Sequence, residues 1–286
     1  MLMRAYYIDL GYKDVRRGQY EKFVFDEDGI PQYRYSNGLF YNITFICHYA
    51  LYHYTLFMKY QRSKNLKRFI QVSDWILSHG EETNDSFIFY YKFHWGDLKP
   101  PWISALGQGR LLSVLSRAFE ATKEERYLRA AKKALHPLKI PAGQGGLLTS
   151  FPDGKIAFAE YPTQQCNIVL NGLITCLVGI YDIASIGKDQ KTEYFFHKAL
   201  KGLEENLSRY DLGYWSQYKL SGIIPHIADT HYHNYHIMQL WALYEMTGRE
   251  IFREYSEKWD RYSGGMHVKM LRFLCQILHW SWKRFK

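Results

Sequence analysis

The sequence predicts an all-α fold, an incomplete α/α barrel or toroid of about four helical hairpins with short strands or long loops at one end. Two observations lead to this prediction. Helical patterns occur in pairs joined by short polar linkers, and longer segments rich in glycine and aromatic residues separate the pairs. In a ring of hairpins, the first helix of each pair lines the inside and the second faces water. A two-layer helical array without ring closure fits the same pattern and stays open as an alternative.

The hairpins follow from apolar periodicity along the chain. Residues 39–60 are apolar or aromatic on nearly every face, which is typical of a buried helix, and 66–77 form its amphipathic partner. The same pattern predicts three more pairs, which are 102–121 with 124–135, 163–184 with 192–207, and 236–246 with 250–259. The linkers within the pairs are alike in length and polarity and lie at 62–65, 122–125, 187–190 and 247–250.

This organisation divides the chain into three predicted parts. Residues 1–38 form an extended segment that packs on the barrel, and 39–262 form the barrel itself. Residues 263–286 alternate basic and apolar positions and form a basic amphipathic helix. Such a tail either packs its apolar face against the domain or makes weak contact with an anionic membrane surface.

Composition narrows the class of partner. The chain has 286 residues, of which 47% are hydrophobic, and its net charge is +9. A basic balance favours an acidic polysaccharide, nucleic acid or anionic lipid. We expect no nucleic acid as partner, because the sequence contains no RNA-binding signature, zinc-finger spacing or dense basic run. The 25 tyrosines offer flat apolar faces with polar tips, which suit a sugar cleft.

Cysteine usage and the N-terminus predict a cytoplasmic protein. The four cysteines are scattered through apolar helical patterns, as expected for free thiols in a reducing compartment. The first seven residues lack the charged and apolar regions of a secretory signal. No window is expected to reach the roughly 20 apolar residues of a membrane span.

Two clusters of proton-transferring side chains lie beside predicted helix starts. In the first, Glu160 and Tyr161 precede Pro162, which keeps Tyr161 extended, and Thr163, which is predicted to cap the helix 163–184. The acid and the phenol would therefore lie at the end of the toroid where the long loops gather. A loop acid that only supports a helix cap has the same local pattern.

The second cluster is the run from His231 to His236. Three close imidazoles are compatible with zinc, but no cysteine lies nearby, and polar lining of a sugar cleft is the favoured interpretation. We therefore predict no metal and no cofactor. On a helix, Tyr232 and His236 would share one face while His233 points elsewhere.

A third tyrosine-rich stretch, 210–218, ends at Tyr218. A phenol with an ordinary pKa near 10 is a poor base at neutral pH, and a neighbouring cation or an oriented hydrogen bond could lower its pKa. Candidates for that role are Arg209, Lys219, His231 and His233. The sequence around Gly107 and Gly109 matches no nucleotide fingerprint, and these glycines are expected to permit close helix packing.

Several stretches of the chain resemble the catalytic, C-terminal region of the D-glucuronyl C5-epimerase family. No single stretch is decisive, but they follow the family's order and cover most of 23–262. They are Phe40–Ile43 through Tyr54, Ser73–Trp75, Pro101–Gly109, Glu160–Thr163 with Val169–Gly172, Leu177–Asp182, and Tyr232–His233 with His236–Ile237 and Gln239–Leu240.

The resemblance implies an α/α barrel, often dimeric, that converts D-glucuronate to L-iduronate in heparosan-type polysaccharides without a redox cofactor. It places the active-site acid and tyrosines on Glu160, Tyr161, Tyr218 and Tyr232. The substrate-binding residues that we expect, with His233 or Arg34 on the substrate carboxylate, are Arg34, Tyr41, Trp102, Gln108, Asn171, His233 and His236. The chain departs from the family in two ways: it lacks the β-rich insertion of the animal enzymes, and Ser221 replaces an arginine.

The chemistry of epimerisation suits these residue types. Removing the C5 proton beside a carboxylate creates an enolate-like dianion, which needs cations or hydrogen-bond donors, a base on one face and an acid on the other. Glu160 and Tyr232 are the predicted opposed pair, without assignment of faces, and Tyr161 and Tyr218 position or polarise. A polysaccharide lyase begins with the same proton abstraction. A glycoside hydrolase would need a second carboxylate, and the remaining alternative is a non-catalytic module that binds acidic glycans. Candidates for the second carboxylate are Asp97, Asp211 and Asp229.

Overall fold

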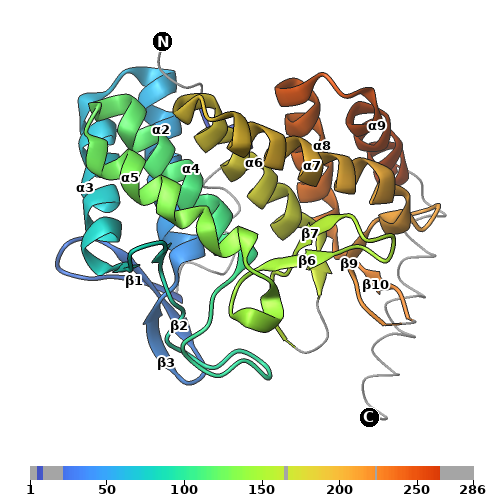
Figure 1. Ribbon diagram of the computed structural model, residues 1–286, viewed down its shortest axis with the longest axis horizontal. Coiled ribbons are helices and arrows are strands. Elements are labelled where there is room, and N and C mark those ends of the chain that lie inside the picture. The colour runs from blue at the N-terminus through green and yellow to red at the C-terminus, as the bar shows by residue number, and fades with distance from the viewer. Residues whose placement is uncertain (1–4, 9–21, 164–166, 223, 265–286) are drawn as a thin grey trace.

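The computed structural model describes residues 5–8, 22–163, 167–222 and 224–264. Within these ranges the α-helices form four antiparallel hairpins (Figure 1). The hairpins pair α2 (Ile43–Tyr60) with α3 (Ser63–His79), α4 (Ala105–Thr122) with α5 (Glu125–Ala134), α6 (Leu170–Gly187) with α7 (Gln190–Asn206), and α8 (Thr230–Thr247) with α9 (Glu250–Gly264).

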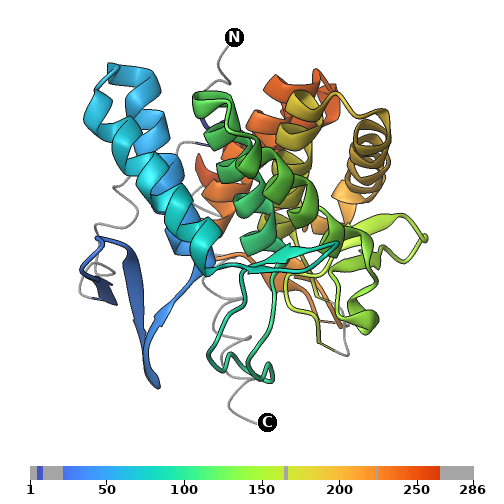
Figure 2. The ribbon, with the colours of Figure 1, turned by 60° about the vertical axis from the view of Figure 1, so that its left-hand side comes forward.

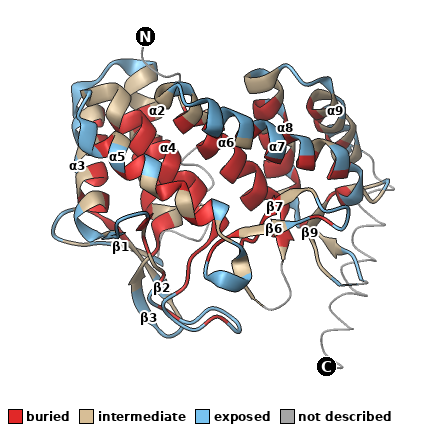
Figure 3. Cartoon of the chain, viewed as in Figure 1, coloured by how far each residue is buried: buried red, intermediate tan, exposed pale blue. Residues whose placement is uncertain are grey.

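The first helices of the hairpins form the inner layer of an incomplete α/α toroid. Helix α2 packs on α4, α4 on α6 and α6 on α8. Figure 2 shows the hairpins turned, and Figure 3 shows that burial is concentrated on the inner helices, with exposed residues on the outer ones. The predicted all-α toroid, with inner and outer helices in alternation, is confirmed.

Short strands gather at one end of the helices, at the bottom of Figure 1. One antiparallel sheet has the order β1-β2-β3 and another the order β10-β9-β8, while β4 pairs with β5 and β6 with β7. Their bounds are β1 Phe23–Phe25, β2 Pro31–Tyr35, β3 Gly38–Tyr41, β4 Glu81–Glu82, β5 Phe87–Ile88, β6 Leu148–Ser150, β7 Ile156–Phe158, β8 Ile168–Val169, β9 Gln217–Leu220 and β10 His226–Ile227. Short 3-10 helices span His136–Lys139, Ala142–Gln144 and Leu207–Tyr210.

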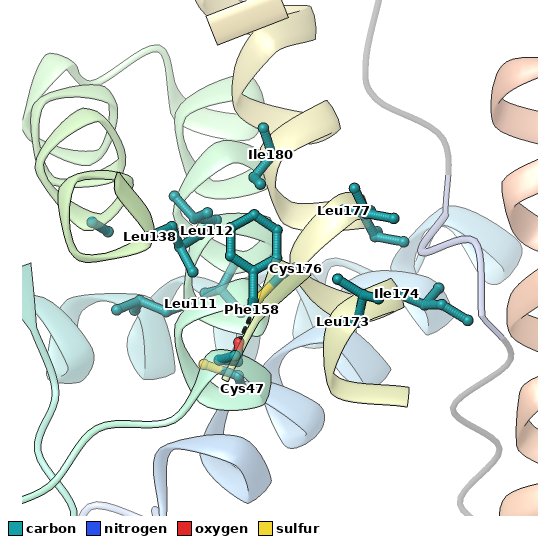
Figure 4. Close-up of a cluster of buried hydrophobic side chains, with 14 of the residues drawn as sticks. Cys47, Leu111, Leu112, Leu138, Phe158, Leu173, Ile174, Cys176, Leu177 and Ile180 are labelled. Atoms are coloured by element: carbon teal, nitrogen blue, oxygen red, sulfur yellow. Dashed lines mark hydrogen bonds between the residues drawn. The ribbon is translucent and has the colours of Figure 1, made fainter. Parts of the chain in front are cut away.

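Glycines allow the two central inner helices, α4 and α6, to pack backbone against backbone. A Cβ on Gly109 would lie 2.7 Å from the carbonyl oxygen of Thr175, and a Cβ on Gly179 would lie 2.3 Å from the carbonyl oxygen of Gly109. The thiol of Cys176 donates to the carbonyl oxygen of Ala105 across the same contact, at 2.9 Å. The predicted role of glycine in close helix packing is confirmed on α4. Leucine, isoleucine and phenylalanine side chains fill the core around the contact (Figure 4).

The inner helices begin at residues other than those predicted, and the shift is largest at α6 and α8. Thr163 does not cap α6, which begins at Leu170 after Val169. The reason is that Ile168 and Val169 pair with β9 as strand β8, and the chain reaches them through a bridge between Tyr161 and Asn167. These two residues are β-branched and suit a strand.

Helix α8 begins earlier than predicted, at Thr230, because the Asp229 carboxylate accepts a hydrogen bond from the backbone N–H of Tyr232 at 2.8 Å. The cluster from His231 to His236 therefore lies inside the helix. The opposite shift occurs at α2, where Gly38–Tyr41 is strand and Asn42 caps the helix.

The prediction that no segment is long and apolar enough for a membrane span was wrong. Among the described residues, α6 is long and apolar enough, with a mean hydropathy of 1.5. However, 72% of that segment is buried inside the protein. The apolar composition of α6 is therefore explained by its position in the centre of the core.

The ends of the chain are described only in part. Tyr6 and Ile8 are buried against the helices, and the β1-β2-β3 sheet occupies much of the remainder of the predicted N-terminal segment. Cys47 and Cys176 are buried free thiols. The predicted C-terminal helix lies outside the described residues from 265 onward, as does Cys275.

Replacing Gly179 with alanine should lower the free energy of unfolding by about 1–3 kcal/mol, because the added methyl group meets the α4 backbone, which cannot move aside cheaply. Gly187→Ala on the same helix is the matched control, since nothing lies within 4 Å of a Cβ there. Urea denaturation of the two variants measures the difference. Equal stability of both variants would contradict backbone contact between α4 and α6.

Candidate active site

Three separate segments bring Glu160, Tyr161, Tyr218 and Tyr232 together. Glu160 and Tyr161 follow β7, Tyr218 lies on β9, and Tyr232 lies in the first turn of α8. Hydrogen bonds join Tyr161 to Glu160, Tyr218 to Tyr161, and Tyr232 to Tyr218. The ring centroids of Tyr218 and Tyr232 are 4.6 Å apart. The four residues thus form one hydrogen-bonded series, which we call the acid–phenol chain.

The carboxyl group of Glu160 is buried at the amino end of α6. Its residue is 3% exposed, and a Cβ on Gly172 would lie 2.2 Å from Oε2. Glycine at 172, in the first turn of α6, therefore makes the space that the carboxyl group occupies. The positive end of the helix dipole favours a negative charge there. Among the described residues, Oε2 is buried without a hydrogen-bond partner.

Burial raises the pKa of Glu160 from its ordinary value to about 7. The hydrogen bond from Tyr161 and the positive charges of Arg110 and Lys219 act in the opposite direction and limit the rise. An acid with a pKa near 7 is populated in both protonation states at neutral pH. It can therefore accept a proton or donate one, as a general acid–base catalyst must.

The three phenols of the chain stay protonated at neutral pH. Burial, followed by the negative charge of Glu160, raises the pKa of Tyr161, Tyr218 and Tyr232 above the ordinary value of 10. The pKa of Tyr218 is therefore shifted in the direction opposite to the one that a base would need. The phenols act as hydrogen-bond donors, and Glu160 is the group of this chain that ionises near neutrality.

Arg110 places a buried positive charge within reach of Glu160. It donates to the carbonyl oxygen of Thr44 at 3.0 Å and to the hydroxyl of Tyr235 at 3.1 Å. Among the described residues, no carboxylate lies within ion-pair distance of Arg110. Arg117, two turns further along α4, is also buried but pairs with Asp182 at 2.5 Å. Arg110 thus keeps an uncompensated charge that acts on Glu160, whereas the charge of Arg117 is neutralised locally.

Lys219 supplies a second positive charge beside the carboxyl group. It follows Tyr218 on β9, is half-buried, and donates to the Asn167 side-chain oxygen at 3.1 Å. Its charge lowers the pKa of Glu160. Arg110 was not among the residues predicted from sequence, whereas Lys219 was named there as a candidate cation beside Tyr218.

His233 and His236 lie behind the acid–phenol chain and meet at Ser216. The backbone N–H of Ser216 donates to Nδ1 of His233 at 3.2 Å, and Nε2 of His233 donates to the carbonyl oxygen of Trp259 at 3.0 Å. His233 is therefore a neutral imidazole with the proton on Nε2. The Ser216 hydroxyl then donates to Nδ1 of His233 at 2.8 Å and accepts from Nδ1 of His236 at 3.0 Å.

This arrangement changes the interpretation of both histidines. They are fully buried on one face of α8, contrary to the prediction that His233 points away from His236. Burial, with the neighbouring His233 and His231, lowers the pKa of His236 to about 3, so His236 is neutral. Both nitrogens of His233 bond to protein groups, which leaves none for a substrate carboxylate. The network instead ties β9, which carries Tyr218, to α8, which carries Tyr232.

Trp102 and Asn171 lie beside the acid–phenol chain, whereas Gln108 lies in the framework. The Trp102 ring is 6.4 Å from that of Tyr161, and its indole nitrogen donates to Phe93 at 2.7 Å. Asn171 precedes Gly172 and is buried, and its Oδ1 has no hydrogen-bond partner among the described residues. The Gln108 amide nitrogen donates to the backbone carbonyls of Phe87 and Ala134. Gln108 therefore holds β5 and α5 against α4.

Tyr41 and Arg34 lie on the hairpin of β2 and β3. The Tyr41 hydroxyl donates to Asp26 at 2.6 Å and its ring packs on Trp75, 4.7 Å between centroids. Through these contacts Tyr41 attaches the hairpin to α3 and to the loop that contains Asp26. Arg34 is exposed on β2, opposite Leu39. The structure describes no contact between either residue and the acid–phenol chain.

The zinc alternative finds no support in the arrangement of side chains. Across the described ranges, no three or more His, Cys, Asp or Glu residues are grouped so as to hold a metal ion. The histidines of α8 are occupied instead by Ser216 and the backbone, as described above.

Solved structures with the same fold include sugar-processing enzymes. A cellobiose 2-epimerase from Bacillus thermoamylovorans matches with a TM-score of 0.59 at 11% identity, covering 91% of this chain and 73% of its own. A glycoside hydrolase family 76 mannosidase from Bacteroides thetaiotaomicron matches with a TM-score of 0.54 at 12% identity, covering 86% and 66%. At these identities the likeness shows the toroid fold alone.

Sequence comparison identifies the family. Residues 81–261 match the family model of the D-glucuronyl C5-epimerase C-terminus. A D-glucuronyl C5-epimerase of Caenorhabditis elegans is 32% identical over 188 residues, which are 60% of this chain and 30% of the nematode protein. An uncharacterised protein of Methanocaldococcus jannaschii is 32% identical over 218 residues, 70% of this chain and 68% of its own.

The fold is an α/α toroid, and both the matching family model and the nematode relative belong to carbohydrate epimerases. More narrowly, the chain belongs to the D-glucuronyl C5-epimerase family, because residues 81–261 match the C-terminal region of that family's enzymes. The resemblance noted in the sequence is confirmed at the level of the family. The chain spans less than a third of the nematode enzyme.

Replacing Arg110 with glutamine should move the activity midpoint governed by Glu160 to higher pH, because a positive charge that lowers the pKa of Glu160 is removed. At a pH below the midpoint, each unit by which the pKa of Glu160 rises reduces the ionised fraction of Glu160 about tenfold. Arg110→Lys keeps the charge and should shift the midpoint less. The check is the pH dependence of epimerase activity in the three proteins, and identical midpoints would remove Arg110 from the electrostatics of the site.

Proposed function

We propose that the protein converts D-glucuronate to L-iduronate at C5 within a heparosan-like acidic polysaccharide. One observation carries the proposal. A buried carboxyl group with a pKa of about 7 ends a chain of protonated phenols, in the field of two cations. Proton exchange at a carbon beside a carboxylate needs this combination of base, acid and positive charge. Family membership supports the same reaction.

Each catalytic role follows from the order of pKa values. With glucuronate bound, Glu160 takes the C5 proton, since it is the member of the chain that is ionised near neutral pH. The electron pair of the C–H bond moves into the substrate carboxylate and forms an enolate-like dianion. Tyr232 then gives its hydroxyl proton to the opposite face of C5, which inverts the centre. In the reverse reaction the two residues exchange roles.

The acid–phenol chain also offers a way to restore the starting state. After inversion, Glu160 carries a proton and Tyr232 has lost one. Tyr161 and Tyr218 connect the two groups through hydrogen bonds. A proton passed from Glu160 along these hydroxyls to Tyr232 returns every group to its original state without a separate exchange with solvent.

Positive charge for the dianion is assigned to Arg110 and Lys219. The family arginine expected near Tyr218 is Ser221 here, so another cation must face the substrate carboxylate. Lys219 lies one residue after Tyr218, and its charge already acts on Glu160. Arg110 is only 6% exposed, so it acts through its field. In a buried site such fields are far stronger than in water.

The three aspartates considered as the second carboxylate of a glycoside hydrolase are poorly placed for that role. Asp211 pairs with Lys258 and accepts from Tyr262 at 3.2 Å, and Asp229 caps α8. Asp97 is exposed in the loop before α4. None of the three is among the charges that shift the pKa of Glu160. A hydrolase needs a pair of carboxyl groups flanking the bond.

Tyr232→Phe should reduce turnover about 10²- to 10⁴-fold while leaving the fold intact, because the variant keeps the ring and loses the proton donor. NMR of heparosan incubated with protein in D2O gives the measurement, through deuterium at C5 together with iduronate signals. Tyr194→Phe, at a 64% exposed position on α7, is the control. Near-normal turnover by Tyr232→Phe would remove Tyr232 from the mechanism, and absorbance of an unsaturated uronate would indicate a lyase instead.

The pH profile of kcat/KM for glucuronate should rise through about pH 7, because Glu160 must be ionised to take the C5 proton and its pKa is about 7. If Glu160 were the acid, activity would fall through the same pH. Initial rates of C5 deuteration from pH 5 to 9 distinguish the two roles.

A further inference from the structure

A line of aromatic rings leads from the acid–phenol chain to the protein surface. The Tyr161 ring lies 6.4 Å from Trp102, and Trp102 lies 5.7 Å from Phe93. Phe93 stacks on Tyr35 at 4.3 Å, and Tyr35 lies 6.1 Å from Trp95. Two segments far apart in sequence, the β2 strand and the loop before α4, build this line together.

Trp95 ends the line with a ring that is open to solvent. It is 47% exposed, although its inward neighbour Phe93 is 2% exposed. A tight turn holds it, because Trp95 and Leu98 exchange both backbone hydrogen bonds, at 3.1 and 3.0 Å. Gly96 supplies the left-handed backbone of the turn, with φ of 55°. The turn therefore presents the indole at little cost in conformational entropy.

One positive charge lies beside the end of this aromatic line. Lys99 is exposed just after the turn, whereas Arg34 precedes Tyr35 on β2 and, because side chains alternate along a strand, points to the other face. Within the part of the chain that the structure describes, neither pairs with a carboxylate. Lys92 pairs with Glu81, and Asp97 is the carboxylate within the turn. An acidic chain that crosses the exposed ring of Trp95 would therefore meet Lys99 as an available cation.

An exposed tryptophan by itself needs no functional explanation. Trp241 on α8 shows the ordinary case. It is 42% exposed, and its indole nitrogen donates to Glu245 one turn along the same helix at 3.1 Å. Trp95 differs because it ends a series of rings that begins at the catalytic residues.

We propose that Trp95 is the platform of a distal sugar subsite, which holds a residue of the acidic polysaccharide beyond the uronate that reacts. The apolar face of a sugar ring would lie on the indole, and Lys99 would meet a carboxylate of the chain. The inference rests on the proposed function for the identity of the polymer. It adds that the enzyme recognises chain length through a surface outside the acid–phenol chain.

Chain-length dependence tests the subsite. Affinity and C5 deuteration are measured with a heparosan trisaccharide centred on glucuronate and with heparosan of ten or more sugars. Trp95→Ala should weaken binding and kcat/KM for the long chain about tenfold, from the loss of one ring contact, and leave the trisaccharide unchanged. Trp95→Tyr should restore part of the loss, and Trp241→Ala should match wild type on both substrates.

The outcomes separate this inference from the proposed function. Wild-type behaviour of Trp95→Ala on both lengths, or an equal loss on both, would overturn the distal subsite while leaving the epimerase intact. If wild type deuterates neither substrate, the proposed function fails, and the subsite is then judged on affinity alone. In that case a length-dependent loss of binding supports it, and equal binding of heparosan by wild type and Trp95→Ala rejects it.

Discussion

Close packing of α4 on α6 is the contact on which the active site depends. Gly109 and Gly179 let the two backbones touch, and this fixes what lies next to them. Arg110 follows Gly109 on α4, and Gly172 lies two turns before Gly179 at the amino end of α6, where the Glu160 carboxyl group is held. A wider spacing between these helices would separate the cation from the acid. The fold thus sets the charge environment of the site through a contact between two glycines.

Burial then gives the site its chemistry. Removing Glu160 and three tyrosines from water raises every one of their pKa values, but the consequences differ. The pKa of the carboxyl group rises to about 7, where the group is useful as a base. The pKa values of the phenols rise further above neutral pH, so the phenols serve as hydrogen-bond donors. Arg110 and Lys219 prevent Glu160 from becoming a permanently protonated acid. One physical effect, desolvation, therefore separates the roles of base and acid within a single hydrogen-bonded chain.

Much of this could be read from the sequence. Paired helical periodicity predicted the hairpins, because burial on one side of a helix leaves a 3.6-residue pattern. Glu160, Tyr161, Tyr218 and Tyr232 stand out as proton-transferring side chains in loops or at a helix start, and the structure brings them together. Thr163 was misjudged because β8 pairs with a strand some 50 residues away, and no local pattern reports such pairing.

The residues that sequence reasoning missed act through distant partners. Arg110 lies in an apolar helix beside Arg117, and only the position of Asp182 distinguishes the neutralised arginine from the uncompensated one. Ser216 gave no signal, because its hydroxyl matters only through His233 and His236 on another element. Histidines in a polar cluster suggested a cleft lining, whereas their spacing of three residues along α8 placed both in the core.

The central claim is that Glu160 is the ionisable group of the site near neutral pH. Its titration can be followed directly by NMR of protein carrying ¹³C-labelled glutamate side chains, with Glu160→Gln identifying the resonance. The account predicts a carboxyl carbon that titrates at about 7. A midpoint near the ordinary value for glutamate would mean that water reaches the carboxyl group, and it would contradict both the buried site and the assignment of Glu160 as the base.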